Sequence, residues 1–384
     1  MTAIAGSRRR LGRFALALAA LAAAIGIAEA ASRALAPPWL GSRMREVAVA
    51  RSLTDWGSDH EWPIERDGRG PFRFIPGSTF TVRDDEYVHD VRIDENGGRA
   101  SGRAGGGRRP IVPVFGDSFT FGIGVRDEET WVSVVDRTAP VRLVNFGMPG
   151  SDLLEQIDQL DALDRRDPGL FKARVCLFVV FLGNDLTTIE SAINRDEGSA
   201  QRRGSVLSDW LSAANAALDA HWILRRWYIV QWGRALTVRA VNATRSEPQV
   251  QGMLALMDRR ARLDGFRRAF GEAVDRLVRA SVRVRFTPSV IIIPDRFQVD
   301  ESLRRNKGAL YGVDSTWYDA RQPNRIVTEA MTAAGIAFID VSACLEGVPG
   351  QHYPRDGHLN AAGHETVAGC VAPFIRERSA AVLR

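Results

Sequence analysis

The sequence predicts an α/β protein built around a doubly wound parallel sheet. Five short apolar runs lack the alternation of half-exposed strands, and segments of helical periodicity separate them. Strands that alternate with helices are typical of parallel sheets covered by helices on both faces. The chain has 384 residues, of which 45% are hydrophobic and 25% charged, so it can bury one large core with extensions.

The N-terminus has the pattern of a bacterial export signal. Arg8–Arg10 and Arg13 precede an uncharged apolar run, Phe14–Ala28. This run is short for a membrane span and suits a signal peptide, with a cleavage site at Ala28-Glu29-Ala30. Alanine-rich sequence continues beyond that site, so an uncleaved anchor is the competing interpretation. We assign residues 1–36 to a signal peptide or membrane helix. We expect a periplasmic protein, anchored to the inner membrane or secreted after cleavage.

Residues 37–109 are expected to be a linker and a short β-rich extension. Pro37-Pro38 and scattered glycine and aspartate residues indicate the linker. Ser78–Val82 and Tyr87–Ile93 are prone to form strands, and the glycine-rich stretch Gly102–Gly107 follows as a loop.

The core domain is predicted to span residues 110–384. Its five apolar runs, each expected to be a buried strand, are Ile111–Phe115, Val141–Phe146, Val175–Leu182, Val290–Ile293 and Ile336–Val341. Its main helical segments are Leu153–Leu163, Phe266–Val282, Ile326–Ala334 and Ala361–Ile375.

Residues 195–260 interrupt the rhythm between the third and fourth runs and are expected to form a helical insertion. Four tryptophans lie in it: Trp210, Trp222, Trp227 and Trp232. The insertion is interpreted as a cap over a site, or as a surface that meets a membrane or a partner. The simpler alternative is that these aromatic side chains pack against the body of the protein.

Charge and cysteine content argue against several function classes. The net charge is +5, and the arginines that carry most of it are scattered, so we expect no nucleic-acid partner. Cys176, Cys344 and Cys370 show no CxxC spacing, which argues against a zinc or thioredoxin-type site, and we expect neither a metal nor a cofactor. Cys344 and Cys370 could pair in an oxidising compartment, but three buried thiols are the favoured interpretation.

The first core run leads into a candidate nucleophile. Gly116-Asp117-Ser118 follows Ile111–Phe115 directly. In an open α/β sheet, ligands bind beyond the carboxyl ends of the strands. A lone Gly-Asp-Ser is a weak motif, but its position after the first strand favours an exposed, functional Ser118.

Later segments supply the other groups that acyl transfer needs. The second run leads to Gly150, the third to Asn184, and Asp356-Gly357-His358 precedes the last helix. A serine needs a base to take its proton, and imidazole titrates near neutral pH, so His358 is the expected base. Asp356 would hold the required tautomer of that ring.

Three donors are expected to form the oxyanion hole. They are the backbone N–H groups of Ser118 and Gly150 and the side-chain amide of Asn184. Glycine at position 150 is expected because a side chain there would crowd the substrate. His352 and His364 lie near the same loop, but both are interpreted as non-catalytic.

Together these four segments resemble the blocks of the SGNH/GDSL hydrolase superfamily, over about residues 110–380 and in the same order. The resemblance implies a flavodoxin-like three-layer α/β/α fold and a metal-free serine esterase mechanism. Many members have Asp-x-x-His, whereas this chain has Asp356-Gly357-His358. The shorter spacing is similar to a branch that includes alginate O-acetylation proteins and other exported polysaccharide-modifying proteins.

Three functions remain open at this stage. The first is an exported esterase that hydrolyses acyl esters, acetyl among them, of a glycan or lipid. The second is an O-acyltransferase that modifies an exported polysaccharide with the same serine. The third is a glycan-binding or assembly protein without turnover, and the complete residue set argues against it.

Overall fold

The computed structural model divides the chain into two compact units. The structure describes residues 20–36, 62–66, 71–84, 86–101, 109–168, 175–196, 227–243, 253–354 and 356–380. The smaller unit draws on residues 1–50, 202–249 and 305–314, and the larger unit on the remainder.

The larger unit is built on a five-stranded parallel sheet. Its order is β6-β5-β7-β8-β9, which is 2-1-3-4-5 in chain order, as in flavodoxin-like folds. The strands are β5 (Ile111–Phe115), β6 (Arg142–Asn145), β7 (Val175–Phe181), β8 (Thr287–Ile293) and β9 (Ala337–Asp340). Every residue of β7 is buried, as its unbroken apolar run predicts.

All five predicted strands are present, and the differences lie at their ends. β8 begins three residues earlier than predicted because its polar start, Thr287-Pro288-Ser289, is paired with β7. Pro113 lies inside β5, yet β5 pairs with β7 only from Val114 onward. A proline has no N–H to donate to a neighbouring strand, so Pro113 is tolerated at a position that is not paired with β7.

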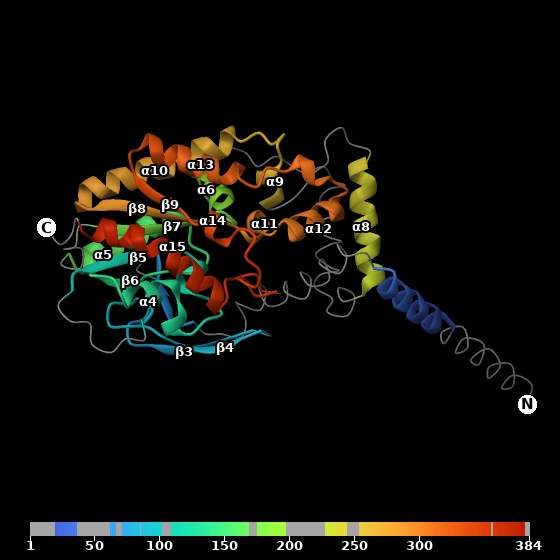
Figure 1. The fold of residues 1–384 in the computed structure, drawn as a ribbon, viewed down its shortest axis with the longest axis horizontal. Helices are drawn as coiled ribbons and strands as arrows, with labels where there is room; N and C mark the ends of the chain where they lie inside the picture. Colours follow the sequence, from blue (N-terminus) through green and yellow to red (C-terminus); the bar gives the residue numbers. More distant parts are fainter. Residues whose placement is uncertain are drawn as a thin grey trace, which may run out of the picture. The chain divides into compact units, whose positions relative to one another are not determined.

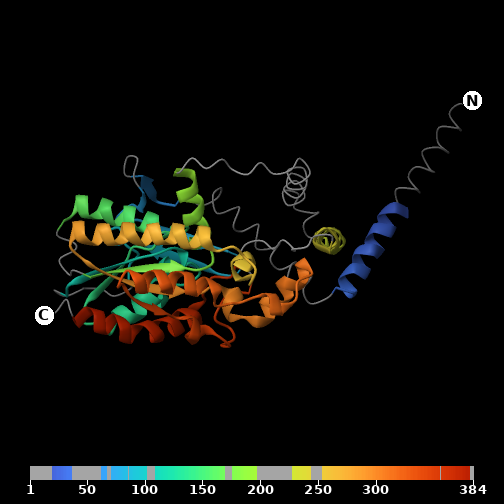
Figure 2. The same ribbon diagram turned by 90° about the horizontal axis from the view of Figure 1, so that it is seen from above.

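Helices cover both faces of the sheet. On one face α10 (Asp264–Val284) packs against α5 (Leu153–Arg166) and α13 (Gln322–Ala333). On the other face α15 (Ala361–Ala380) packs against α4 (Trp131–Asp136). Figure 1 shows this arrangement, and Figure 2 shows the strands between α5 and α10 on one side and α15 on the other. The four predicted main helices are therefore present, in a three-layer α/β/α architecture.

Shorter helices and turns complete the larger unit. Those near the sheet are α3 (Ser118–Phe121), η1 (Asp127–Glu129), α6 (Asp185–Asp196), α9 (Met253–Met257), α11 (Arg296–Val299), η3 (Ser315–Trp317) and α14 (Ser342–Leu345). α12 (Glu301–Tyr311) follows α11, and its residues from 305 onward belong to the smaller unit.

The N-terminal extension packs on the sheet domain. β1 (Ile64–Arg66) pairs with β2 (Phe72–Phe74), and β3 (Thr79–Arg83) pairs with β4 (Val88–Arg92), both antiparallel. The apolar side chains of these hairpins join Phe121 and Ile123, which follow the candidate nucleophile, in one core cluster. Extension and sheet domain therefore share a core.

A buried guanidinium links the same two parts. Arg99 donates from Nε to Asp127, at 3.0 Å, and its terminal nitrogens donate to the carbonyl groups of Phe121, Gly122 and Val125. The Arg99 side chain has no exposed surface. Because a buried charge is tolerated only when it is paired and hydrogen-bonded, this network fixes the segment that follows Ser118.

The smaller unit contains the helix of residues 20–34 and α8 (Tyr228–Ala243). The Glu29 carboxylate accepts hydrogen bonds from the backbone N–H groups of Tyr228 and Ile229, at 3.0 and 3.1 Å. Within the described ranges, no helix combines the length and apolar character that a membrane span requires. The expected membrane helix is thus not supported, although Arg8–Arg10 and the first part of the apolar run lie outside the described residues.

The described part of the insertion is helical. It comprises the end of α6, then α8 and α9. Trp210 and Trp222 fall outside the described residues, whereas Trp227 and Trp232 lie at or within α8.

The two arginines that contact Asp127 allow a matched test of burial. Replacing Arg99 by Met leaves a buried carboxylate without its main partner, so we expect Arg99→Met to lower the free energy of unfolding by about 3–5 kcal/mol. Arg92 also contacts Asp127, at 3.0 Å, but its side chain is 58% exposed. Arg92→Met should cost no more than about 1 kcal/mol. Urea denaturation of both variants measures the difference, and equal losses would contradict it.

Candidate active site

A tight turn after β5 presents the Ser118 side chain. Asp117 caps α3, because its carboxylate accepts from the Phe119 backbone N–H at 2.9 Å. A Cβ at position 116 would lie 2.0 Å from Thr120 Oγ1, so only glycine fits at this turn. Ser118 stays partly exposed at the carboxyl end of β5. The strand order reverses between β5 and β7, which is where ligands bind in open α/β sheets.

The structure brings Ser118, His358 and Asp356 together in one hydrogen-bonded chain. His358 Nε2 lies 2.8 Å from Ser118 Oγ, and Nδ1 lies 2.8 and 3.0 Å from the two carboxylate oxygens of Asp356. The His358 side chain is 10% exposed and that of Asp356 only 2%. These distances are within hydrogen-bond reach for proton transfer from serine to imidazole.

A glycine between acid and base allows the short spacing. Gly357 has φ +88°, a left-handed conformation that favours glycine. Its N–H donates to the Tyr353 carbonyl at 3.1 Å, which closes a turn. Asp356 and His358 can therefore face each other although only one residue separates them.

The loop that carries Gly150 is tied to the serine turn. The Met148 N–H and the Ser151 hydroxyl both donate to the Gly116 carbonyl, at 2.8 and 2.9 Å. Gly150 has φ +84°, and a Cβ built on it would meet no atom within 4 Å. The left-handed backbone conformation by itself favours glycine here, and the expected crowding of a substrate by a larger side chain stays a prediction.

Asn184 follows β7 at the start of α6. Its carbonyl group accepts from the N–H groups of Thr187 and Thr188, at 2.9 and 3.0 Å. Its side-chain oxygen is buried and has no hydrogen-bond partner among the described residues. The structure thus places Ser118, Gly150 and Asn184 after three neighbouring strands, β5, β6 and β7, and their role as oxyanion donors stays a prediction.

Two buried carboxylates, Asp117 and Asp185, are next to Ser118 and Asn184 in the chain. Burial raises the pKa of Asp117 to about 6, against the opposing effects of the Phe119 N–H and His358. Burial, reinforced by the charge of Asp117, raises the pKa of Asp185 well above its usual range. Asp185 accepts from the Phe181 N–H at 3.1 Å. Sequence analysis gave these residues no role, because burial of a carboxylate depends on the tertiary fold.

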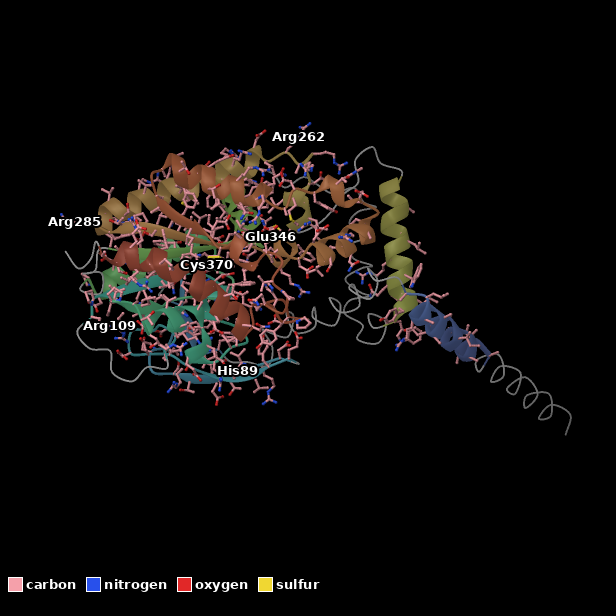
Figure 3. The ribbon with its side chains drawn as sticks, in the orientation of Figure 1. His89, Arg109, Arg262, Arg285, Glu346 and Cys370 are labelled. Atoms are coloured by element: carbon pink, nitrogen blue, oxygen red, sulfur yellow. A yellow bond between two sulfur atoms is a disulfide. The ribbon has the colours of Figure 1, made fainter. Side chains whose placement is uncertain are left out.

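A disulfide brackets the loop that holds Asp356 and His358. Cys344 in α14 and Cys370 in α15 form a disulfide, with Cα atoms 6.4 Å apart. Cys370 is labelled in Figure 3. The favoured interpretation of three free thiols was therefore wrong for two of them. Only the packing of α14 against α15 brings the pair together. Cys176 is a free, buried thiol.

Two further histidines lie near the site, and their rings are neutral. His364 is 1% exposed, and its Nδ1 accepts from the Trp131 N–H at 3.1 Å. Burial lowers the pKa of His364 to about 3 and that of His352 to about 4, so both rings are neutral at pH 7. His358 is the histidine that contacts Ser118.

Two residues missed by sequence analysis contact the candidate acid. The Tyr87 hydroxyl donates to Asp356 Oδ2 at 2.8 Å, and Glu86 Oε2 accepts from the Asp356 backbone N–H at 2.8 Å. Both precede β4, about 270 residues before Asp356 in the chain. No local pattern marks such a contact. Over the described ranges, no cluster of three or more His, Cys, Asp or Glu side chains could hold a metal ion.

Comparison with known proteins gives structural similarity only. No family model matches the chain, and no curated protein sequence matches it. The fold is similar to a lipolytic protein of the G-D-S-L family from Veillonella parvula, with 13% identity and a TM-score of 0.35, over 68% of this chain and 96% of that one. It is also similar to an acetylxylan esterase from Geobacillus stearothermophilus, with 13% identity and a TM-score of 0.34, over 71% and 96%.

The raised pKa of Asp117 predicts a pH-dependent stability. Between the ordinary aspartate value of 3.8 and about 6, the folded state holds a proton on Asp117 that the unfolded state has released. Stability therefore falls as pH rises through this window, by roughly 3 kcal/mol for a shift of this size. Asp117→Asn keeps an acceptor for the Phe119 N–H and removes the charge.

Urea denaturation of the wild type and of Asp117→Asn from pH 4 to 8 measures this contribution together with the coupling of Asp117 to Asp185. The stability of Asp117→Asn relative to the wild type should rise by roughly 3 kcal/mol between pH 4 and pH 8. A difference that does not vary with pH would contradict the assignment.

The disulfide predicts a stability loss on reduction. Cys344 and Cys370 are 26 positions apart, and closing a loop of this size in the unfolded chain is worth about 3.5 kcal/mol. The variant Cys344→Ser/Cys370→Ser should lose stability of this order. Dithiothreitol should lower the melting temperature of the wild type and leave that of the double variant unchanged. If the reductant affects both proteins alike, the bond is not the cause.

Proposed function

We propose that this protein is a serine ester hydrolase that acts through an acyl-enzyme. The observation that carries the proposal is the contact of His358 Nε2 with Ser118 Oγ, at 2.8 Å, while Asp356 holds Nδ1 of the same ring. A nucleophile, a base and a group that orients the base are the elements of serine-dependent acyl transfer.

The reaction proceeds in two halves. His358 takes the Ser118 proton as Oγ attacks the ester carbonyl, and the protonated imidazole then donates that proton to the departing alkoxide. Water enters, gives a proton to His358 and attacks the acyl-serine, and the proton passes back to Ser118 as the carboxylic acid leaves. Asp356 stays ionised and stabilises the imidazolium in both halves.

Three donors are proposed for the oxyanion. The N–H groups of Ser118 and Gly150 and the amide of Asn184 follow adjacent strands, and the loop of Gly150 is fixed to the serine turn by two hydrogen bonds to Gly116. Donors that are held in place before the reaction stabilise the developing charge without reorganisation. The loss of one costs about 10²–10³ in rate.

The proposed substrate is an acyl ester, with acetyl the simplest case, of a glycan or lipid. A second function is favoured by one feature, the short spacing of Asp356 and His358, which resembles that of polysaccharide O-acetylation proteins. In that case a sugar hydroxyl replaces water in the second half of the reaction. The basic, apolar N-terminus supports export to the periplasm, and the disulfide suits that oxidising compartment.

The mechanism predicts that the full chain hydrolyses p-nitrophenyl acetate and that Ser118→Ala lowers kcat by at least about 10³-fold without loss of stability. His358→Ala should have an effect of similar size. Ser302→Ala, a change at an exposed serine whose hydroxyl donates to Asp300, is the matched control and should keep full activity. A folded, active Ser118→Ala variant would rule out the mechanism.

The acceptor is tested in the same assay. If water is the acceptor, release of p-nitrophenol is fast without additives, and an oligosaccharide does not change it. If release requires the oligosaccharide and acetylated sugar appears in the mass spectrum, the protein is a transferase. A fluorophosphonate probe that labels Ser118 in neither case would favour a binding protein.

A further inference from the structure

Two residues of the N-terminal extension contact Asp356, the candidate acid. Tyr87, at the end of the β3–β4 connection, is 6% exposed, and its hydroxyl lies 2.8 Å from Asp356 Oδ2. The preceding residue, Glu86, accepts from the Asp356 backbone N–H at 2.8 Å. Two consecutive residues of the extension therefore hold both the side chain and the backbone of Asp356.

The hydrogen bonds of Asp356 show what Tyr87 supplies. The ring nitrogen of His358 lies within 3.0 Å of both carboxylate oxygens, and the Tyr87 hydroxyl is a further donor to one of them. The Asp356 side chain is 2% exposed, so solvent cannot easily replace a lost donor. A second donor also fixes the rotation of the carboxylate plane.

The position of the Tyr87 hydroxyl is itself constrained. Its ring packs at 4.9 Å from the ring of Tyr353, whose hydroxyl donates to the Gly124 carbonyl at 2.6 Å. His89, labelled in Figure 3, stacks on the Tyr87 ring at 5.9 Å. Burial and the Asp356 carboxylate raise the pKa of Tyr87, so the hydroxyl keeps its proton and acts as a donor. A donor held by packing is preorganised.

We propose that Tyr87 is a positioning residue for catalysis, which acts by holding the Asp356 carboxylate against His358. This inference rests on the proposed serine esterase function. Under this proposal the extension contributes to catalysis through Tyr87, in addition to its structural role. Without the hydroxyl, the carboxylate can rotate away from Nδ1, and the imidazole then loses the orientation that Ser118 requires.

A purely structural role is the alternative, because Tyr87 also belongs to the core cluster of the extension. The two roles differ in what they change. A structural role affects the free energy of unfolding and is independent of Asp356. A positioning role lowers kcat at nearly constant KM, and its effect disappears when the carboxylate is removed.

The experiment uses Tyr87→Phe in the full chain with p-nitrophenyl acetate. The change removes one oxygen atom and keeps the packed ring. Because a hydrogen bond to a charged group is lost, we expect kcat to fall about tenfold and KM to change less than twofold. The matched control is Tyr318→Phe, at a tyrosine that is 4% exposed and belongs to another part of the same unit, and its kcat should stay within twofold of wild type.

A double-mutant cycle separates the two roles. In the Asp356→Asn background, Tyr87→Phe should change the residual rate less than twofold, since the carboxylate is absent. A tenfold loss in both backgrounds, or no loss in the wild-type background, would overturn the proposal. If the wild type neither hydrolyses the ester nor reacts with a fluorophosphonate, the proposed function fails and this inference fails with it. A reactive wild type with an equally reactive Tyr87→Phe variant refutes the inference alone.

Discussion

The candidate site depends on one imidazole that must bridge two distant parts of the chain. His358 contacts Ser118, 240 positions earlier, through Nε2 and Asp356 through Nδ1. Neither contact comes from regular secondary structure around His358, which lies in a loop ahead of α15. The fold must therefore hold that loop from several sides.

Each side of the loop has its own attachment. The disulfide joins the helices that flank it, Arg296 donates to the carbonyl groups of Tyr353 and Pro354 at 3.1 Å, and Glu86 holds the Asp356 backbone. Arg99 secures the segment after the nucleophile from the same extension. The Arg99 guanidinium is fully buried and paired with Asp127, so its hydrogen bonds are charge-assisted. The extension and the sheet domain thus form one functional structure.

Much of the fold could be predicted because an unbroken apolar run indicates a buried strand, whichever segments cover it. β5 and β7 are buried on both faces, as their apolar sequences predict without any information on the helices that cover them. The positions of Ser118, Gly150 and Asn184 followed from the rule that sites form beyond the carboxyl ends of parallel strands. Contacts between distant segments could not be predicted in this way. Tyr87 has no local signature, and the bond between Cys344 and Cys370 depends on how α14 meets α15.

The short Asp-x-His spacing links these observations. With one residue between them, acid and base can meet only if the backbone reverses at that residue, and Gly357 at φ +88° provides the reversal. A turn this tight fixes the two residues relative to each other, and among the described residues the only contact that it provides for the Asp356 carboxylate is His358 Nδ1. Tyr87 supplies the additional constraint from outside the loop, at 2.8 Å. The orientation of the Asp356 carboxylate therefore depends on Tyr87 of the extension. The short spacing of Asp356 and His358 explains why a tyrosine 269 positions earlier contacts the acid.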